Sequence, residues 1–260
     1  MHEKATLTYF SFRVNPSCGK KFFVLNSLML YTIYRIPNTI LMIKSNEQLI
    51  KELTELGYLK SSRLIEAFEK IDRINFISDE LKDSAYVNEP LPIGFGQTIS
   101  QPLTVAFMLE LLDLKRREKV LEIGSGSGWQ TALIAFMIEH PGGITEDEDG
   151  LYGMVAIERI PELKKMTEKN VSHYSFIERG VVKVIEGDGS RGREEDAPYD
   201  KIIAAAAGND IPKEWKEQLR IGGKIVAPVK NSVVLMEKTG KNEFEKKEFF
   251  GFSFVPLVRD

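Results

Sequence analysis

The segment that most constrains the fold is a short, mostly apolar strand pattern, Val120–Ile123, which leads directly into the glycine-spaced sequence GSGSG and then into an apolar helical pattern. Short β-branched runs and helical patterns continue to alternate until about residue 228. Such alternation builds βαβ units, in which parallel strands form one sheet with helices on both faces. We therefore predict an α/β fold with a doubly wound, mostly parallel sheet of the Rossmann-like kind.

The individual elements can be placed from this alternation. We expect strands at 119–123, 153–158, 181–186, 201–206 and 223–228, and helices at 130–139, 161–170 and 213–219. In the tail, the apolar runs 232–240 and 249–258 flank a polar turn, TGKNE. This pattern favours antiparallel strands that close one edge of the sheet.

An N-terminal helical cap is expected at residues 45–87, within a catalytic domain that spans 45–260. Apolar residues recur with helical spacing on both sides of Gly57, which predicts two amphipathic helices. Ser45, with Gln48 three positions later, has the pattern of a helix N-cap. Residues 88–100 carry two prolines and two glycines and are expected to form a shaped loop, after which Pro102 begins a helix.

Residues 1–44 fit no element of this domain and are expected to lie outside the fold. The apolar stretch 20–43 is interrupted by Asn26, Arg35, Pro37 and Asn38, whereas a membrane span needs about 20 mostly apolar residues. We expect no membrane anchor and a functional protein that begins at Met42. The acidic insert 141–153 is expected to be a solvated loop away from the site.

Composition narrows the classes of function. A net charge of −3 gives no basic surplus for tracking phosphates, so a nucleic-acid partner is disfavoured. One cysteine cannot form an intrachain disulfide, and the three scattered histidines have no metal-ligand spacing. We expect a cytoplasmic, monomeric protein without a metal.

The glycines of GSGSG, residues 124, 126 and 128, favour a nucleotide-like ligand. A triphosphate-binding loop would need lysine followed by serine or threonine after the glycines, and none follows. A dinucleotide-binding turn would need a glycine where Trp129 or Thr131 stands. The turn is therefore expected to accept an uncharged or cationic ligand.

Acidic residues near three successive strand ends support this reading. Glu122 precedes the glycine turn, Glu158 could accept hydrogen bonds from ribose hydroxyls, and Asp188 could reach an adenine amino group. Carboxyl ends of parallel strands share one edge, so we expect these acids to face one crevice. The constellation resembles that of S-adenosylmethionine-dependent methyltransferases.

A narrower resemblance rests on longer segments. The sequences YVNEPLPIGFGQTISQP, VLEIGSGSGWQTALIA, GDGSRG, APYDKIIAAAA, QLRIGGKIVAPV and FVPLV occur in an order similar to that of the protein-L-isoaspartate O-methyltransferases, over about residues 47–258. The resemblance implies methyl transfer from S-adenosylmethionine to the α-carboxylate of L-isoaspartyl residues in damaged proteins and peptides. The ester then cyclises to a succinimide, whose hydrolysis returns some normal aspartate.

The resemblance also implies the site residues. Ser100 is the candidate catalytic residue, since its hydroxyl would hold the substrate carboxylate, although a serine here could also cap the next helix. The residues expected to bind the cofactor are Thr98, Ile99, Ser100, Glu122, Gly124, Gly126, Glu158, Asp188 and Gly189.

Three departures from the family pattern concern the substrate side, and one of them is the turn after the fourth expected strand, where Ala205–Asn209 replaces the family's Thr-Ala-Ala-Ala-Pro pattern. Asn88 stands where the family commonly has aspartate, and Phe95 where it has a polar residue. The alternatives are a related methyltransferase acting on RNA or a small carboxylic acid, and a cofactor-binding module without activity.

Overall fold

The computed structural model describes residues 45–139 and 153–259. The expectations for residues 1–44, for a start at Met42 and for the insert 141–152 fall outside these residues. In chain order the elements are α1 (Asn46–Glu55), α2 (Ser62–Lys70), η2 (Arg73–Phe76), η3 (Asp79–Ser84), β1 (Leu91–Gly94), β2 (Gln97–Ile99), α3 (Pro102–Leu112), β3 (Lys119–Ile123), α4 (Trp129–Ile138), β4 (Gly153–Glu158), α5 (Pro161–Ser172), β5 (Val182–Glu186), η4 (Gly189–Arg191), η5 (Glu194–Asp196), β6 (Tyr199–Ala204), α6 (Lys213–Gln218), β7 (Leu219–Val229), β8 (Ser232–Lys238) and β9 (Phe244–Phe250).

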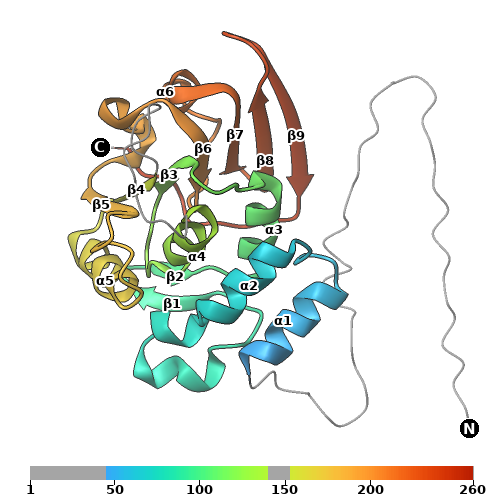
Figure 1. Ribbon diagram of the computed structural model, residues 1–260, viewed down its shortest axis with the longest axis vertical. Helices are drawn as coiled ribbons and strands as arrows, with labels where there is room; N and C mark the ends of the chain where they lie inside the picture. Colours follow the sequence, from blue (N-terminus) through green and yellow to red (C-terminus); the bar gives the residue numbers. More distant parts are fainter. Residues whose placement is uncertain (1–44, 140–152, 260) are drawn as a thin grey trace, which may run out of the picture.

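The main sheet has seven strands in the order β5-β4-β3-β6-β7-β8-β9 (Figure 1). Strands β5, β4, β3, β6 and β7 are parallel, and β8 and β9 follow as antiparallel neighbours. The chain enters this sheet at β3, continues outward through β4 and β5, and then crosses back to β6 on the other side of β3. This reversal creates a topological switch point between β3 and β6, where open α/β sheets bind their ligands.

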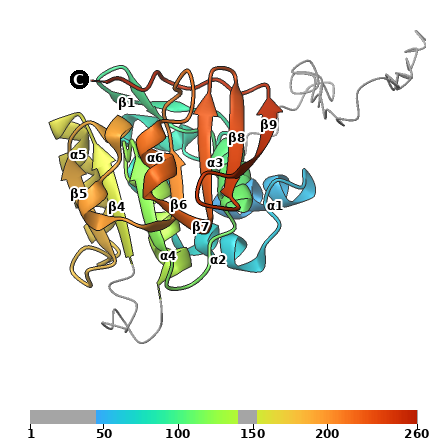
Figure 2. The same cartoon turned by 90° about the horizontal axis from the view of Figure 1, so that it is seen from above.

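Helices cover both faces of the sheet, as the alternation of strand residues requires (Figure 2). Val120 and Ala156 face the larger apolar cluster, which includes buried residues of helices α1 to α5. Their neighbours Leu121 and Val155 face the other cluster, together with Trp215 of α6. The Rossmann-like, doubly wound, mostly parallel sheet is therefore confirmed.

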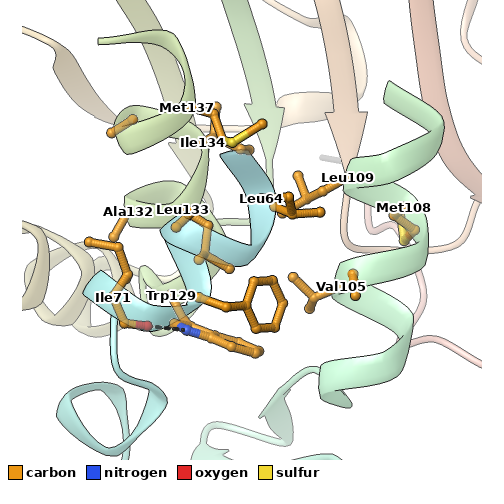
Figure 3. Close-up of a cluster of buried hydrophobic side chains, with 14 of the residues drawn as sticks. Leu64, Ile71, Val105, Met108, Leu109, Trp129, Ala132, Leu133, Ile134 and Met137 are labelled. Carbon is orange, nitrogen blue, oxygen red and sulfur yellow. Dashed lines mark hydrogen bonds between the residues drawn. The ribbon is translucent and has the colours of Figure 1, made fainter. Parts of the chain in front are cut away.

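The N-terminal helices belong to the main core. Ser45 caps α1 as predicted, since its Oγ accepts a hydrogen bond from the Gln48 amide at 3.2 Å. Leu64 of α2 is buried among side chains of α3 and α4, including Leu109 and Leu133 (Figure 3). The helical cap is thus fixed to the catalytic core by the same apolar cluster that supports the sheet.

Residues 88–100 form a hairpin, where the sequence predicted only a loop. Strands β1 and β2 pair antiparallel, with Leu91 opposite Ile99. The turn residues Phe95 and Gly96 have φ values of +54° and +70°. Positive φ at both central positions matches the twist of a two-residue hairpin turn. The prolines and glycines that suggested a loop therefore shape short strands and a tight turn.

The last strand is the other correction. The antiparallel tail is confirmed, but β9 is built from FEKKEFF, and the apolar run 249–258 contributes only its first two residues to it. β9 is an edge strand with charged, exposed residues, which block further strand pairing. Beyond it, Pro256 pairs with Ala207 just after β6. The C-terminal segment thus returns to the edge of the sheet where the glycine turn lies.

Within residues 45–139 and 153–259, no helix is long and apolar enough to cross a membrane.

Candidate functional site

The glycine turn leaves β3 at the switch point. Gly124, Gly126 and Gly128 have φ values of +82°, +56° and +85°, a backbone region that other residues rarely adopt. Gly124 donates its amide hydrogen to the Ile157 carbonyl of β4 at 2.8 Å. A Cβ added at Gly126 would lie 3.3 Å from Cδ1 of Ile93 in β1. The hairpin and the glycine turn are therefore in contact.

Glu158 anchors this turn from the end of β4. One of its carboxylate oxygens accepts a hydrogen bond from the Gly126 amide at 2.9 Å, and the other accepts from the Ile160 amide at 3.0 Å. A carboxylate offers about four lone-pair sites, so two remain for other donors. The structure thus places Glu158 against the glycine turn with capacity left for the hydroxyls of a ribose.

Helix α5 holds the same turn from behind, through residues that the sequence did not single out. Thr167 donates its hydroxyl hydrogen to the Gly126 carbonyl at 3.0 Å, and Asn170 donates to the Ser127 carbonyl at 2.9 Å. A Cβ added at Gly128 would lie 3.2 Å from Cα of Thr167. Close packing of this turn on α5 therefore requires glycine at 128. The threonine and asparagine lie on a helix whose sequence shows only an amphipathic pattern.

Glu122 does not face the crevice, contrary to the sequence prediction. Its side chain is fully buried, and its carboxylate accepts hydrogen bonds from Thr131 at 2.6 Å and Gln130 at 3.0 Å. Strand alternation explains this position, because Glu122 shares the α4 face of β3 with Val120. Glu122 therefore braces the first turn of α4, and its expected contact with the cofactor stays a prediction.

Burial raises the pKa of Glu122 to about 7, although hydrogen bonds from Thr131 and Gln130 oppose the shift. The unfolded chain loses this proton near pH 4.3. Between about pH 5 and 7 this carboxyl therefore holds more proton in the folded protein than in the unfolded chain, and its contribution to stability falls as the pH rises.

The Glu122→Gln variant cannot ionise, so it should lack this fall. We expect the free energy of unfolding of the variant, relative to that of the wild type, to rise by up to about 1.4 kcal/mol for each pH unit in that window. Denaturant titrations at several pH values measure this difference. A constant difference across the window would show that Glu122 does not carry the shifted proton.

Asp188 and Gly189 lie in the loop after β5. The Asp188 carboxylate accepts hydrogen bonds from the Ser190 amide at 2.8 Å and from its hydroxyl at 2.9 Å. A Cβ at Gly189 would come within 2.5 Å of Ile123, so only glycine lets this loop approach the end of β3. A cavity of about 180 Å³ opens beside Asp188, with Arg259 of the C-terminal segment on its wall.

Ser100 follows β2 on the hairpin, which also carries the exposed Thr98 and the buried Ile99. The alternative role of Ser100 as a helix cap is not supported, because Gln101 occupies the N-cap position of α3. The Leu103 amide in the first turn of α3 is bound instead by the Asn88 side-chain oxygen at 3.0 Å. Among the described residues, the Ser100 hydroxyl has no hydrogen-bond partner and is available to a ligand.

This contact gives a structural role to Asn88, one of the departures from the family pattern. We expect Asn88→Ala to lower the free energy of unfolding by about 1 kcal/mol, the usual cost of losing a helix cap. Asn88→Asp should retain most of the stability, because a carboxylate oxygen also accepts the bond. Equal stability of wild type and Asn88→Ala in urea titrations would refute this role.

Trp129 is turned away from the glycine turn. It is 2 % exposed, packs edge-on against Phe68 at 5.5 Å, and donates its indole hydrogen to the Ile71 carbonyl at 3.2 Å. It therefore joins α4 to the helical cap, in a position where a dinucleotide-binding turn would have glycine.

The structure thus brings most predicted site residues to one edge of the sheet. Glu158 and the glycines 124 and 126 contact one another or the hairpin of Thr98–Ser100, and Asp188 and Gly189 border the end of β3. Glu122 lies behind them. No cluster of metal-binding side chains occurs in the described part of the chain.

The sequence model of the family described as protein-L-isoaspartate(D-aspartate) O-methyltransferase matches residues 44–260. A relative named protein-L-isoaspartate O-methyltransferase from Methanopyrus kandleri is 40% identical over 219 residues, which are 83% of this chain and 92% of the relative. One of the same name from Methanococcus aeolicus is 42% identical and covers 83% of this chain and 95% of its own.

Solved structures agree with the fold. A Plasmodium falciparum protein described as a protein-L-isoaspartate O-methyltransferase, in complex with S-adenosyl-L-homocysteine, has a TM-score of 0.73 at 21% identity, over 84% of this chain and 100% of its own. A second structure of that name has a TM-score of 0.69 at 24% identity, over 83% of this chain and 66% of its own.

Proposed function

Because the chain belongs to the protein-L-isoaspartate(D-aspartate) O-methyltransferase family, we propose that it methylates the α-carboxylate of L-isoaspartyl residues in damaged proteins and peptides, with S-adenosyl-L-methionine as methyl donor. The observation that carries the proposal is the contact between two parts of the site. The hairpin that bears Ser100 lies against the glycine turn that Glu158 anchors. Nucleophile and methyl donor can therefore meet at one edge of the sheet.

The residues around the turn fit S-adenosyl-L-methionine. Glu158 retains acceptor capacity for ribose hydroxyls, and Asp188, in the loop that approaches the end of β3, can accept a hydrogen bond from an adenine amino group. The bound donor supplies a methyl group activated by a positively charged sulfur.

The chain itself has little chemistry to perform. A substrate carboxylate is already ionised near neutral pH, so no general base is needed. The Ser100 hydroxyl would donate a hydrogen bond to one carboxylate oxygen and leave the other free to attack. What remains is alignment of the attacking oxygen with the methyl group, in a site that excludes water. Ser100 is thus the candidate catalytic residue, with Thr98 and Ile99 beside the methionine part of the donor.

RNA is a poorer substrate for this site. The strongest basic cluster, residues 115–119, ends where β3 begins, whereas the glycine turn follows the other end of that strand. Within this cluster Lys115 already pairs with Asp113. The cluster therefore lies at the edge of the sheet opposite to the proposed site and cannot hold a nucleic acid beside it.

A methyl-transfer assay tests the proposal. The protein is incubated with methyl-labelled S-adenosyl-L-methionine and an isoaspartyl peptide, the aspartyl isomer of that peptide, or RNA. We expect base-labile label on the isoaspartyl peptide alone. Stable label on RNA would favour the related methyltransferase, and binding of S-adenosylhomocysteine without transfer to any acceptor would favour a module without activity.

We further propose that the protein acts as a monomer in the cytoplasm. The single cysteine of the sequence is what a reducing compartment permits. Light scattering on the purified chain tests the first part, and cell fractionation tests the second.

A further inference from the structure

Arg73 of η2 is a fully buried arginine outside the set of expected site residues. Its guanidinium donates hydrogen bonds to four backbone carbonyls, and all of them lie between residues 85 and 100. Nη1 reaches the carbonyls of Ala85 at 2.7 Å and Val87 at 3.2 Å. Nη2 reaches those of Glu89 at 2.9 Å and Ser100 at 3.2 Å.

The last two acceptors lie on opposite sides of the hairpin. Glu89 precedes β1 and Ser100 follows β2, so one nitrogen atom joins both ends of the hairpin. The hairpin is too short to be stable by its own pairing, since two-stranded ribbons are marginal in water. The Arg73 guanidinium therefore fixes where the hairpin ends, and with it the backbone of Ser100.

Arg73 also contacts the helix that follows the glycine turn. Its guanidinium carbon lies 5.4 Å from the ring centre of Trp129, the first residue of α4. The Trp129 indole is in turn bound to the Ile71 carbonyl, two residues before Arg73 (Figure 3). One side chain thus connects the hairpin of the substrate side with the helix that follows the cofactor turn.

Burying the charged guanidinium of Arg73 costs free energy, which is unfavourable for a residue whose only role is stability. Burial lowers the pKa of Arg73 to about 10, so the group stays charged at neutral pH. No carboxylate pairs with it in the described part of the chain, and its Nε has no hydrogen-bond partner there. Buried charges usually carry an ionic partner, and apolar replacements of buried ions are often at least as stable.

We propose that Arg73 is a positioning residue for methyl transfer, which sets the place of Ser100 relative to the glycine turn. The inference rests on the proposed function. Because alignment is the main task of this site, a displacement of about 1 Å can cost about 100-fold in rate. Lysine cannot replace the planar fork, since it has three donors on one rotating nitrogen.

A double-mutant cycle of Arg73→Lys with Ser100→Ala tests the proposal, with kcat and kcat/KM for an isoaspartyl peptide as readouts. We expect Arg73→Lys to lower kcat by roughly 10- to 100-fold. In the Ser100→Ala background the same change should cost at least about fivefold less, because the two residues act as a unit. The KM for S-adenosyl-L-methionine should stay within about twofold, since Thr167 and Asn170 hold the cofactor turn independently.

Arg63→Lys is the matched control. Arg63 also comes from the cap and also binds backbone carbonyls, those of Phe136 and Met137 at 2.9 Å each, but at the far end of α4. It should lower the melting temperature, leave kcat near the wild-type value and combine multiplicatively with Ser100→Ala.

Arg73→Met is the second variant, because methionine is apolar and of similar length. It still tests the proposal if Arg73→Lys does not fold. Wild-type kcat in either folded variant, equal losses in both backgrounds, or failure of both variants to fold would overturn the proposal. These results are distinct from failure of the proposed function, in which the wild-type protein itself would not methylate the peptide.

Discussion

Glu158→Ala is expected to weaken the binding of S-adenosylhomocysteine. The lost hydrogen bonds to ribose hydroxyls alone account for roughly 10- to 150-fold, and the total loss of affinity should be larger. The same carboxylate holds the amides of Gly126 and Ile160, and without it the glycine turn loses a fixed acceptor. Calorimetric titration with S-adenosylhomocysteine measures the change.

Glu186→Ala supplies the matched control for this prediction. Glu186 lies directly opposite Glu158 in the pairing of β4 with β5, but it is exposed, whereas Glu158 holds the Gly126 amide of the glycine turn. Its replacement should change the affinity by less than about twofold, because an exposed carboxylate off the turn loses no buried bond. Equal affinities of wild type and Glu158→Ala would remove Glu158 from the cofactor site.

Ser100→Ala is expected to lower kcat/KM for an isoaspartyl peptide by roughly 10- to 150-fold, which is the loss of one hydrogen bond to a charged group. The melting temperature should not change, because the hydroxyl has no partner in the described part of the chain and Asn88 caps α3 in its place. Steady-state kinetics and thermal unfolding on the same preparation measure both effects.

Asn88→Ala should have the opposite effect to Ser100→Ala, since it should reduce stability more than it reduces activity. The two variants therefore separate the candidate catalytic hydroxyl from the neighbouring cap. If Ser100→Ala keeps the wild-type kcat/KM, the serine has no part in holding the substrate.

The central sheet could be predicted because its strands are buried on both faces. Runs such as Met154–Ile157 and Ile202–Ala204 remain apolar at successive positions, and helical patterns separate the strands. The edge strand β9 could not be predicted in this way. Its four successive charged residues, 245–248, are exposed on both sides of the strand, and only its pairing with β8 defines it as a strand.

The candidate site also has a part that the sequence predicts and a part that it does not. Glycine spacing and strand ends predicted that Gly126, Glu158 and Asp188 lie at one edge of the sheet, because topology brings the carboxyl ends of parallel strands together. The burial of Glu122 on the α4 face of β3 follows from strand alternation. Its place near the end of the strand does not by itself show which face it lies on. The contacts of Arg73 with Ser100 and of Thr167 with Gly126 span 27 and 41 residues. No local pattern encodes contacts at such separations.

Conversion of an isoaspartyl peptide into its aspartyl isomer tests the central claim most directly. The peptide is incubated with the protein and S-adenosyl-L-methionine, and the isomers are separated and weighed by mass spectrometry over time. We predict a transient species one methyl group heavier, then a succinimide, and then accumulating aspartyl peptide that depends on both protein and methyl donor. Consumption of the methyl donor without formation of the aspartyl isomer would contradict the account.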